Sequence, residues 1–145
     1  MIEYSFEPGP IRLLRVAHGD DLIAALTQYA AERDIRAASL AFLGAVRRAS
    51  LRYYDQEAKQ YRDFTIDAHL EVVAGTGNIS ILEGKPFIHA HAAFADAEGK
   101  AYGGHVNEGT EVFALEVTVW ELNGVAPVRE LDETTGLMLW GPPTG

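Results

Sequence analysis

The chain has 145 residues, 48% of them apolar and none of them cysteine, which suits one globular domain with its own core and excludes disulfides and thiolate metal sites. Its 12 basic and 21 acidic residues give a formal net charge of -9, a balance that disfavours nonspecific attraction to nucleic acid and to anionic membranes. Because the N-terminus lacks the features of a secretory signal and no apolar run could span a bilayer, we expect a cytoplasmic protein whose single domain occupies residues 1–145.

The N-terminal part of the chain predicts one short strand and one helix. Residues 11–16 follow the sequence Pro8-Gly9-Pro10 and are expected to form the first strand. A helix is expected over about 20–33, where Asp20 can cap the first turn. Its buried side is predicted from apolar residues at helical spacing, namely Leu22, Ile23, Leu26, Tyr29 and Ala30.

From residue 37 onward the pattern changes to β-strands. The glycine-rich residues 75–78 are expected to form a turn, the polar residues 56–60 a connection, and residues 125–131 and 137–140 a last hairpin. Apolar and alternating runs predict the other strands, over residues 38–46, 49–54, 64–74, 79–82, 87–95, 101–106 and 112–122.

The last of these strands shows the clearest alternation. Its core-facing residues are predicted to be Phe113, Leu115, Val117 and Val119. Many strands together with one early helix predict an α+β fold, in which a single domain has a large, mainly antiparallel β-sheet backed by one or two helices.

Three of the five histidines lie in one short segment of the chain. His89 and His91 are two residues apart, so both imidazoles would project from the same face of a strand. The residues after Ala95 can form a turn, and pairing of Ala95 with Ala101 would place His91 directly opposite His105. Either this pairing holds, or the two glycines before His105 form a bulge that redirects its side chain.

Three imidazoles without a thiolate suit a borderline divalent metal, so we predict a metal site, most readily for zinc, at His89, His91 and His105. Two structural alternatives stay open: each histidine bonds a backbone carbonyl, or the three line a subunit interface. His18 and His69 are expected to lie outside the cluster.

Three further residues are candidates for catalysis or binding. Glu71 interrupts an apolar strand and is a candidate general base, metal ligand or partner of an imidazole, with exposure on the outer face of the sheet as the alternative. Arg47 is a candidate for binding an anionic ligand, or else forms a surface ion pair. Asn78 is a candidate ligand contact or a turn residue. The five cations within residues 47–62 form either a basic patch or a solvated hairpin.

Several motifs occur in a recognisable order along the chain, and by that order it resembles the PPC domain, the plant and prokaryote conserved domain, in a stand-alone prokaryotic type without an AT-hook. The motifs are Gly-Asp-Asp-Leu at 19–22, Gly-Asn-Ile-Ser at 77–80, Gly-Lys-Pro-Phe-Ile-His-Ala-His at 84–91, Gly-Gly-His at 103–105 and Glu-Val at 116–117. The resemblance covers about residues 11–140. It implies a homotrimer of compact subunits, each with a mainly antiparallel sheet and two helices, the second expected near 107–111.

The resemblance also carries expectations about function. In plants the domain accompanies an AT-hook, which holds the minor groove of DNA, while the domain itself mediates assembly. This chain has no Arg-Gly-Arg-Pro core of an AT-hook. The fold is also similar to a domain of acetolactate decarboxylase, a metal enzyme with a His-x-His pair and a later histidine, a pattern that His89, His91 and His105 match.

Two functions remain open from the sequence. The first is a homotrimeric binding and assembly module with a three-histidine metal site, associated with DNA or regulation through partners, although the acidic charge disfavours direct DNA contact. The second is a small metal-dependent enzyme, similar to a decarboxylase or lyase, that acts on an oxo acid while Glu71 or a water molecule moves the proton. A third possibility is that a bound metal or hydrogen bonds of the histidines only stabilise the trimer.

Overall fold

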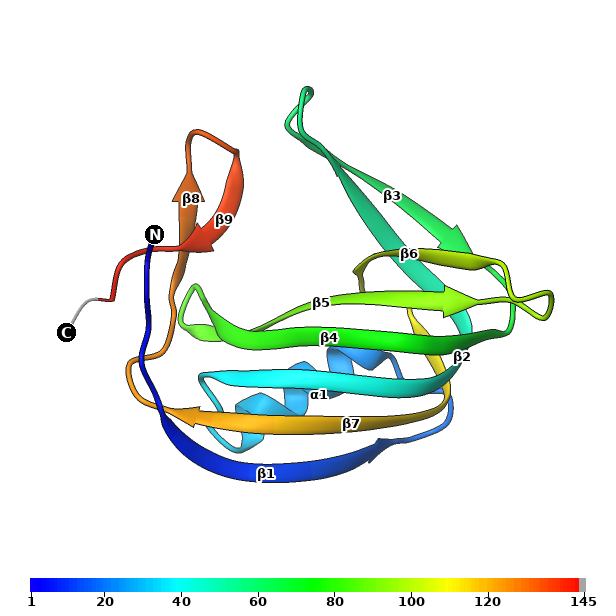
Figure 1. Cartoon of the computed structure of the whole chain (residues 1–145), viewed down its shortest axis with the longest axis horizontal. Helices are drawn as coiled ribbons and strands as arrows, with labels where there is room; N and C mark the ends of the chain where they lie inside the picture. Colours follow the sequence, from blue (N-terminus) through cyan, green and yellow to red (C-terminus); the bar gives the residue numbers. More distant parts are fainter. Residues whose placement is uncertain (144–145) are drawn as a thin grey trace.

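The computed structural model describes residues 1–143, and this part of the chain forms nine strands and one helix. Seven strands make one sheet in the order β1-β7-β2-β4-β5-β6, with β3 paired to β2, while β8 and β9 form a separate hairpin (Figure 1). The pairings are antiparallel, and the single helix backs the sheet, so the predicted α+β fold is confirmed. The elements are β1 (Glu7–Val16), α1 (Leu22–Glu32), β2 (Ala38–Asp55), β3 (Gln60–Ile66), β4 (Leu70–Leu82), β5 (Lys85–Ala95), β6 (Ala101–Val106), β7 (Glu111–Asn123), β8 (Arg129–Asp132) and β9 (Leu137–Trp140).

The helix α1 packs its apolar side against one face of the sheet. Asp21, rather than Asp20, caps the helix, because its carboxylate accepts a hydrogen bond from the backbone N–H of Ala24 at 2.8 Å. The same carboxylate accepts a hydrogen bond from the N–H of Gly109, which ties the start of the helix to the turn before β7. The predicted apolar stripe is confirmed, since Tyr29 is partly buried against the core and the other members are buried: Leu22, Ile23, Leu26 and Ala30.

Within residues 1–143 the second helix implied by the family resemblance is absent. Residues 107–110 instead form a turn between β6 and β7. The buried Thr110 hydroxyl stabilises this turn, lying 3.0 Å from the carbonyl oxygen of Asn107 and 3.1 Å from that of Ser50. At 11 residues α1 is short, and the described part of the chain has no helix with the length and apolar character needed to cross a membrane.

The strand β2 is continuous over 18 residues, where the sequence pattern predicts two strands. Its first half pairs with β7 and β4, and its second half pairs with β3 and β6. Register shifts near Gly44, which has a φ of 140°, bend the strand without ending it. Because β2 reaches β6, the strands β2, β4, β5 and β6 close into a ring that holds the β5–β6 hairpin in place.

The glycine-rich residues 75–78 lie inside β4, so the predicted turn there is wrong. These residues pair with β2 on one side and with β5 on the other, and the glycines give the space that neighbouring groups need. A Cβ atom at Gly75 would lie 2.1 Å from the Phe42 ring, and a Cβ atom at Gly77 would lie 2.5 Å from the carbonyl oxygen of His89. The predicted strand over 64–74 is also wrong, because β3 and β4 divide that segment between them.

Replacing Gly75 by alanine is expected to lower the free energy of unfolding by about 1–3 kcal/mol, because the added methyl group must displace the buried ring of Phe42. Urea unfolding followed by circular dichroism measures this loss. Glu71→Ala is the matched control on the same strand: its side chain is exposed, so the change should stay below about 0.5 kcal/mol. Equal stability of Gly75→Ala and the wild type would show that the ring moves aside at no cost.

Phe113 is exposed, contrary to the predicted alternation in β7. The register of β7 against β2 shifts between Val112 and Ala114, which leaves Phe113 as the extra residue of a bulge and puts Val112 in the core. The predicted residues beyond the bulge are buried, namely Leu115, Val117 and Val119.

Two hairpins, β2–β3 and β8–β9, project from the sheet on the same side (Figure 1). The second of them confirms the predicted C-terminal hairpin and is anchored to β4, since the N–H of Ile81 donates to the carbonyl oxygen of Pro127 at 2.9 Å. The strands β4 and β5 run beneath the space between the two hairpins. The hairpins therefore add walls above part of the sheet.

Candidate metal centre

The three clustered histidines project from the adjacent strands β5 and β6. His91 lies directly opposite His105, and Ala95 opposite Ala101, so the predicted pairing is confirmed and continues without a register shift. The ring centroids are 5.1 Å apart for His89 and His91, 5.1 Å for His89 and His105, and 5.3 Å for His91 and His105. One ring nitrogen of each histidine lies within 4.8 Å of the others.

Strand pairing places these imidazoles on the sheet face opposite the core. His89 lies across from Asn78 of β4, and His91 lies across from Thr76. The alternating neighbours Ile88 and Ala90 point the other way and are 4% and 1% exposed. The histidines are therefore held by a strand whose other face is fixed in the core, which keeps the three rings together.

This donor set fits one divalent metal ion. Three imidazole nitrogens at this separation are typical of zinc sites that keep a further position for water or a ligand. His18 and His69 lie outside the group, as predicted: the ring of His18 packs against Phe113 at 5.2 Å, and His69 is exposed beside a different cavity.

The histidines line a cavity of about 610 Å³ between the two projecting hairpins. Tyr53, Tyr54 and Tyr61 of the β2–β3 hairpin form one side, and residues 136–139 of the β8–β9 hairpin form another. The hairpins touch where the Tyr54 hydroxyl donates to the carbonyl oxygen of Thr135 at 2.5 Å. A cavity of this volume is typical of a small-molecule site.

Arg129 of β8 also lines this cavity, and it was not among the residues predicted from the sequence. Its side chain is held by hydrogen bonds from Nε to Ser80 Oγ at 2.8 Å and from Nη1 to the carbonyl oxygen of Met138 at 2.9 Å. Its Nη2 atom lies 3.2 Å from Asn78 Oδ1 and 3.3 Å from Nδ1 of His89. The predicted candidate Asn78 therefore lies at the site, where it positions the guanidinium.

The other two candidates lie away from the three-histidine cavity. Glu71 is exposed on β4 and lines a separate cavity of about 320 Å³ together with His69. Arg47 is exposed on β2 and forms an ion pair with Glu111 at 3.3 Å. Neither side chain is among the residues that line the cavity of Arg129.

Burial keeps two of the imidazoles neutral. It lowers the pKa of His89 from 6.5 to about 4, and the charge of Arg129 and the neighbouring His91 add to this shift. Burial likewise lowers the pKa of His105 from 6.5 to about 4, with further contributions from His89, His91 and then the two arginines. A neutral imidazole keeps the lone pair that a metal requires, so these shifts favour metal binding at neutral pH.

The same shifts predict how stability depends on pH in metal-free protein. Between pH 6.5 and about 4 the unfolded chain binds more protons at His89 and His105 than the folded chain does. The free energy of unfolding is therefore expected to be highest above pH 6.5 and to fall as the pH falls towards 4. Urea unfolding of chelator-treated protein at several pH values measures this slope, and a His89→Gln, His105→Gln variant should have a flatter one. A wild-type stability that is constant over this window would contradict the prediction.

Comparison with known proteins gives these features a family context. The family model for the Plants and Prokaryotes Conserved (PCC) domain matches residues 4–123. A metal-containing protein from Archaeoglobus fulgidus is 43% identical, with a TM-score of 0.93 over 97% of this chain and 99% of that chain. A plant- and prokaryote-conserved protein from Pyrococcus horikoshii is 30% identical, with a TM-score of 0.91 over 97% of each chain. A protein from Ralstonia eutropha JMP134, named as a candidate DNA-binding protein, is 31% identical, with a TM-score of 0.81 over 90% of each chain.

Two more distant similarities concern parts of larger proteins. The bifunctional protein GlmU of Synechococcus sp. (strain JA-3-3Ab) is 28% identical over 127 residues, which are 86% of this chain and 19% of that protein. The chain thus spans about a fifth of the length of the curated relatives it matches. The α-acetolactate decarboxylase of Bacillus subtilis strain 168 has a TM-score of 0.55 at 13% identity over 92% of this chain and 60% of that chain, which shows the fold relation expected from the sequence.

Proposed function

The chain belongs to the Plants and Prokaryotes Conserved (PCC) domain family, and on that premise we propose that it is a metal-dependent, small-molecule-binding protein that assembles as a homotrimer. A divalent ion, for which zinc is the best match to three imidazole donors, is held by His89, His91 and His105. The observation that carries this proposal is the convergence of three ring nitrogens in a cavity that has room for a ligand. The metal-containing relative from Archaeoglobus fulgidus supports it.

The chain provides the surroundings that such a site needs. When bound, the ion supplies a Lewis acid that stabilises negative charge on a ligand oxygen. Burial keeps His89 and His105 neutral, and the two hairpins form two sides of the cavity beside the histidines. Elemental analysis of the purified protein tests the proposal: about one divalent ion per chain supports it, whereas protein that stays metal-free after incubation with zinc overturns it.

A second candidate is an enzyme of the decarboxylase or lyase type that acts on an oxo acid. The observation in its favour is the cavity beside the histidines, in which a substrate could reach both the metal and a proton donor. Glu71 does not line this cavity, so Tyr54, Tyr61 or a water molecule is a better candidate to move the proton. Zinc-loaded protein should be assayed against a panel of oxo acids. Turnover that is lost in a His91→Ala variant supports this candidate, and no turnover across the panel rules against it.

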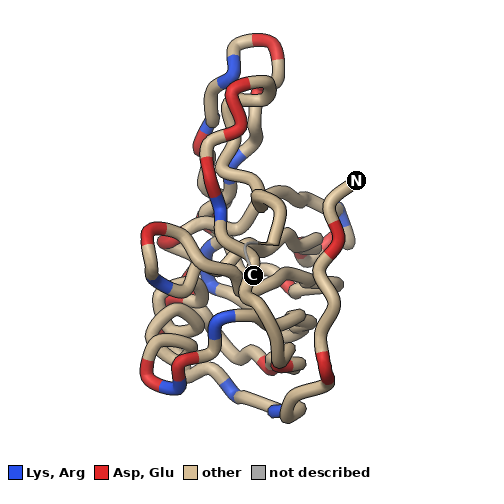
Figure 2. Tube along the Cα trace, turned by 90° about the vertical axis from the view of Figure 1, so that its left-hand side faces the viewer, with Lys and Arg blue, Asp and Glu red and all other residues tan. Residues whose placement is uncertain are grey.

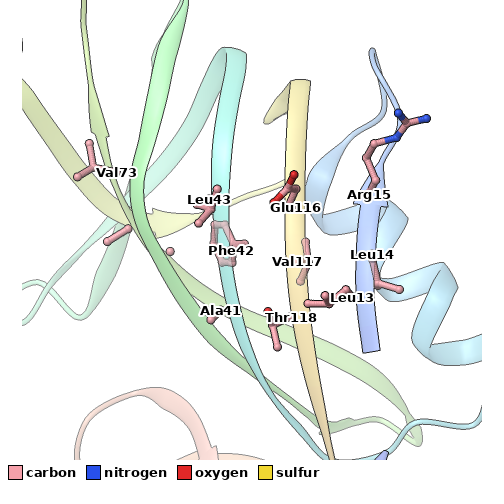
Figure 3. A pocket seen from close by; sticks show the side chains of 12 residues that line it. Leu13, Leu14, Arg15, Ala41, Phe42, Leu43, Val73, Glu116, Val117 and Thr118 are labelled. Atoms are coloured by element: carbon pink, nitrogen blue, oxygen red, sulfur yellow. The ribbon is translucent and has the colours of Figure 1, made fainter. Parts of the chain in front are cut away.

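The homotrimer is proposed to form through an apolar groove on the outer face of the sheet (Figure 3). The groove has a volume of about 540 Å³, and Leu13 of β1, Leu43 of β2 and Val73 of β4 line it while being 82%, 57% and 63% exposed. Arg15 and Glu116 also line the groove, and they lie opposite each other in the register of β1 and β7. Neighbouring copies of the chain would bury this surface, which is otherwise costly to expose to water.

Direct DNA contact is not part of this proposal, because three of the five cations within residues 47–62 pair with carboxylates. Arg52 forms two hydrogen bonds to Asp63, at 3.0 and 3.1 Å, and Arg62 pairs with Asp55. Figure 2 shows the side of the molecule that lies on the left in Figure 1, where basic and acidic positions are interspersed with no long basic stretch.

We expect the purified protein to leave a DNA duplex unshifted in a gel assay, even at low ionic strength, because the chain has a net charge of -9 and six of its 12 lysine and arginine side chains pair with carboxylates instead of being free to neutralise phosphates. A basic DNA-binding protein run in parallel shows that the assay detects binding. A shift that weakens as salt is added would revive the DNA-binding interpretation suggested by the name of the Ralstonia eutropha relative.

A further inference from the structure

The three-histidine cavity is positively charged in a strongly acidic chain. The whole sequence has a net charge of -9, yet no aspartate or glutamate is found among the described residues that line this cavity. The charged groups that line it are Arg52 and Arg129, accompanied by the three histidines. Asp63 neutralises Arg52 through two hydrogen bonds, so of the two cations that line this cavity Arg129 is the one that pairs with no carboxylate among the described residues.

Arg129 is placed in a fixed position. It is 8% exposed, and its guanidinium lies 5.0 Å from the centre of the Phe87 ring and 5.8 Å from that of the Trp140 ring. A guanidinium has five N–H groups, and the contacts to Ser80, Met138, Asn78 and His89 occupy four of them. A buried cation that neutral groups hold in place is suited to bind an anion, because its desolvation cost is offset only when the opposite charge arrives.

The contact between Arg129 and His89 connects this cation to the proposed metal site. A neutral imidazole has one lone pair, and the arginine, which can only donate, occupies it through Nδ1 of His89 at 3.3 Å. A metal ion bound by the same imidazole needs that lone pair, so His89 cannot serve both at once. Metal binding therefore releases one N–H of Arg129, which adds to the N–H of Nη1 that has no partner among the described residues.

We propose that Arg129 recognises the carboxylate of a small ligand, and that metal and carboxylate bind cooperatively because His89 releases Arg129 when it binds the metal. This inference rests on the proposed function and names the ligand class of the same site: a 2-hydroxy or 2-oxo carboxylate, whose hydroxyl or keto oxygen would bind a metal held by the three histidines. The planar guanidinium matches a carboxylate, and the apolar parts of Tyr53, Phe87 and Met138 along the cavity suit an apolar substituent. Arg129 lies outside residues 4–123, which match the family model, so this recognition is a property of the C-terminal hairpin.

Isothermal titration calorimetry with the full chain tests the proposal. The probe is lactate, its uncharged analogue lactamide is the first control, and inorganic phosphate is a competing anion. Zinc-loaded protein, freed of excess metal, is expected to bind lactate about tenfold or more tightly than chelator-treated protein, and lactamide at least tenfold more weakly than lactate. Equal lactate affinity with and without zinc would overturn the cooperativity, and equal affinity for lactamide would overturn recognition of the charge. Tighter binding of phosphate than of lactate would overturn the assignment of a carboxylate.

Variants connect the binding to Arg129. Arg129→Gln is expected to retain its zinc and lose about tenfold or more in lactate affinity, and Arg129→Lys should recover only part of it, since an ammonium lacks the planar fork. Arg47→Gln is the matched control, because it removes the same charge from a surface ion pair outside the cavity and should bind lactate like the wild type. Wild-type lactate affinity in zinc-loaded Arg129→Gln would overturn the proposal.

The two proposals can fail separately. Metal content is measured before each titration, so a wild-type protein that binds no metal overturns the proposed function and this inference together. This inference alone is overturned if the wild-type protein binds zinc but binds lactate and lactamide equally well, and if Arg129→Gln binds lactate as tightly as the wild type does. If Arg129→Gln does not fold, the affinities of the wild-type protein for lactate and for lactamide, each measured with and without zinc, still decide the outcome.

Discussion

Replacing His89 and His91 together by alanine is expected to reduce the metal content from about one divalent ion per chain to almost none. The variant leaves one of three imidazoles in a group whose nitrogens lie within 4.8 Å of one another. A single neutral imidazole does not retain a divalent ion through purification, because the affinity of such sites comes from several ligands held in place before the ion binds. Elemental analysis of tag-free protein, after incubation with zinc and removal of the excess, measures the effect.

The chain offers a matched control for this experiment. His18→Ala, His69→Ala removes the same number of imidazoles from exposed positions outside the group and should keep the wild-type metal content. Far-UV circular dichroism confirms that both double variants are folded, which is expected because His89 and His91 project from the sheet face opposite the core. Metal that persists in His89→Ala, His91→Ala would show that the ion binds elsewhere.

Replacing Leu43 by glutamate is expected to convert a homotrimer into a monomer. Leu43 is 57% exposed in the apolar groove, so the substitution costs the isolated subunit little. In an assembly that covers the groove, each copy would bury an unpaired carboxylate, at a cost of several kcal/mol per subunit. Light scattering coupled to size-exclusion chromatography should show a mass near three times the chain mass of 15.8 kDa for the wild type and near 15.8 kDa for the variant.

Leu131→Glu is the control for the trimer experiment. This leucine is 63% exposed on β8, outside the groove, and its replacement should leave the mass unchanged. A wild-type protein that runs as a monomer would contradict the homotrimer, while a Leu43→Glu variant that remains a trimer would place the interface on another surface. Because the groove lies apart from the three-histidine cavity, the monomeric variant also shows whether metal binding needs the assembly.

Features that depend on neighbouring residues in the chain could be predicted from the sequence. The apolar stripe of α1 follows from helical spacing, and the pairing of His91 with His105 follows from a short turn between two strands. The three-histidine group was therefore predictable in composition and in register. The family resemblance, which rests on motifs whose order can be read directly from the chain, is likewise confirmed by the family model and by a similar solved structure.

Features that depend on packing between distant segments were predicted wrongly. Gly75 and Gly77 predict a turn locally, but they lie in a strand because Phe42 and the backbone of His89 need the space. Phe113 continues an apolar alternation, but a bulge against β2 leaves it exposed. A local pattern contains no information about the ring or the strand that will lie opposite.

The candidate site shows the same division. Its metal-ligand set lies within one hairpin, where strand spacing and turn length determine which side chains meet. Arg129 is the only lysine or arginine after Lys100, and this isolation in an acidic C-terminal segment is the one signal in the sequence that could have identified it. Arg129 and His89 are 40 positions apart in the chain. They meet because the segment that leads into β8 packs against β4, the neighbour of the strand that holds His89. The geometry of a single hairpin thus determines that the three imidazoles lie together. Only the tertiary structure decides that a buried arginine and a cavity lie beside them, because both depend on contacts between distant segments.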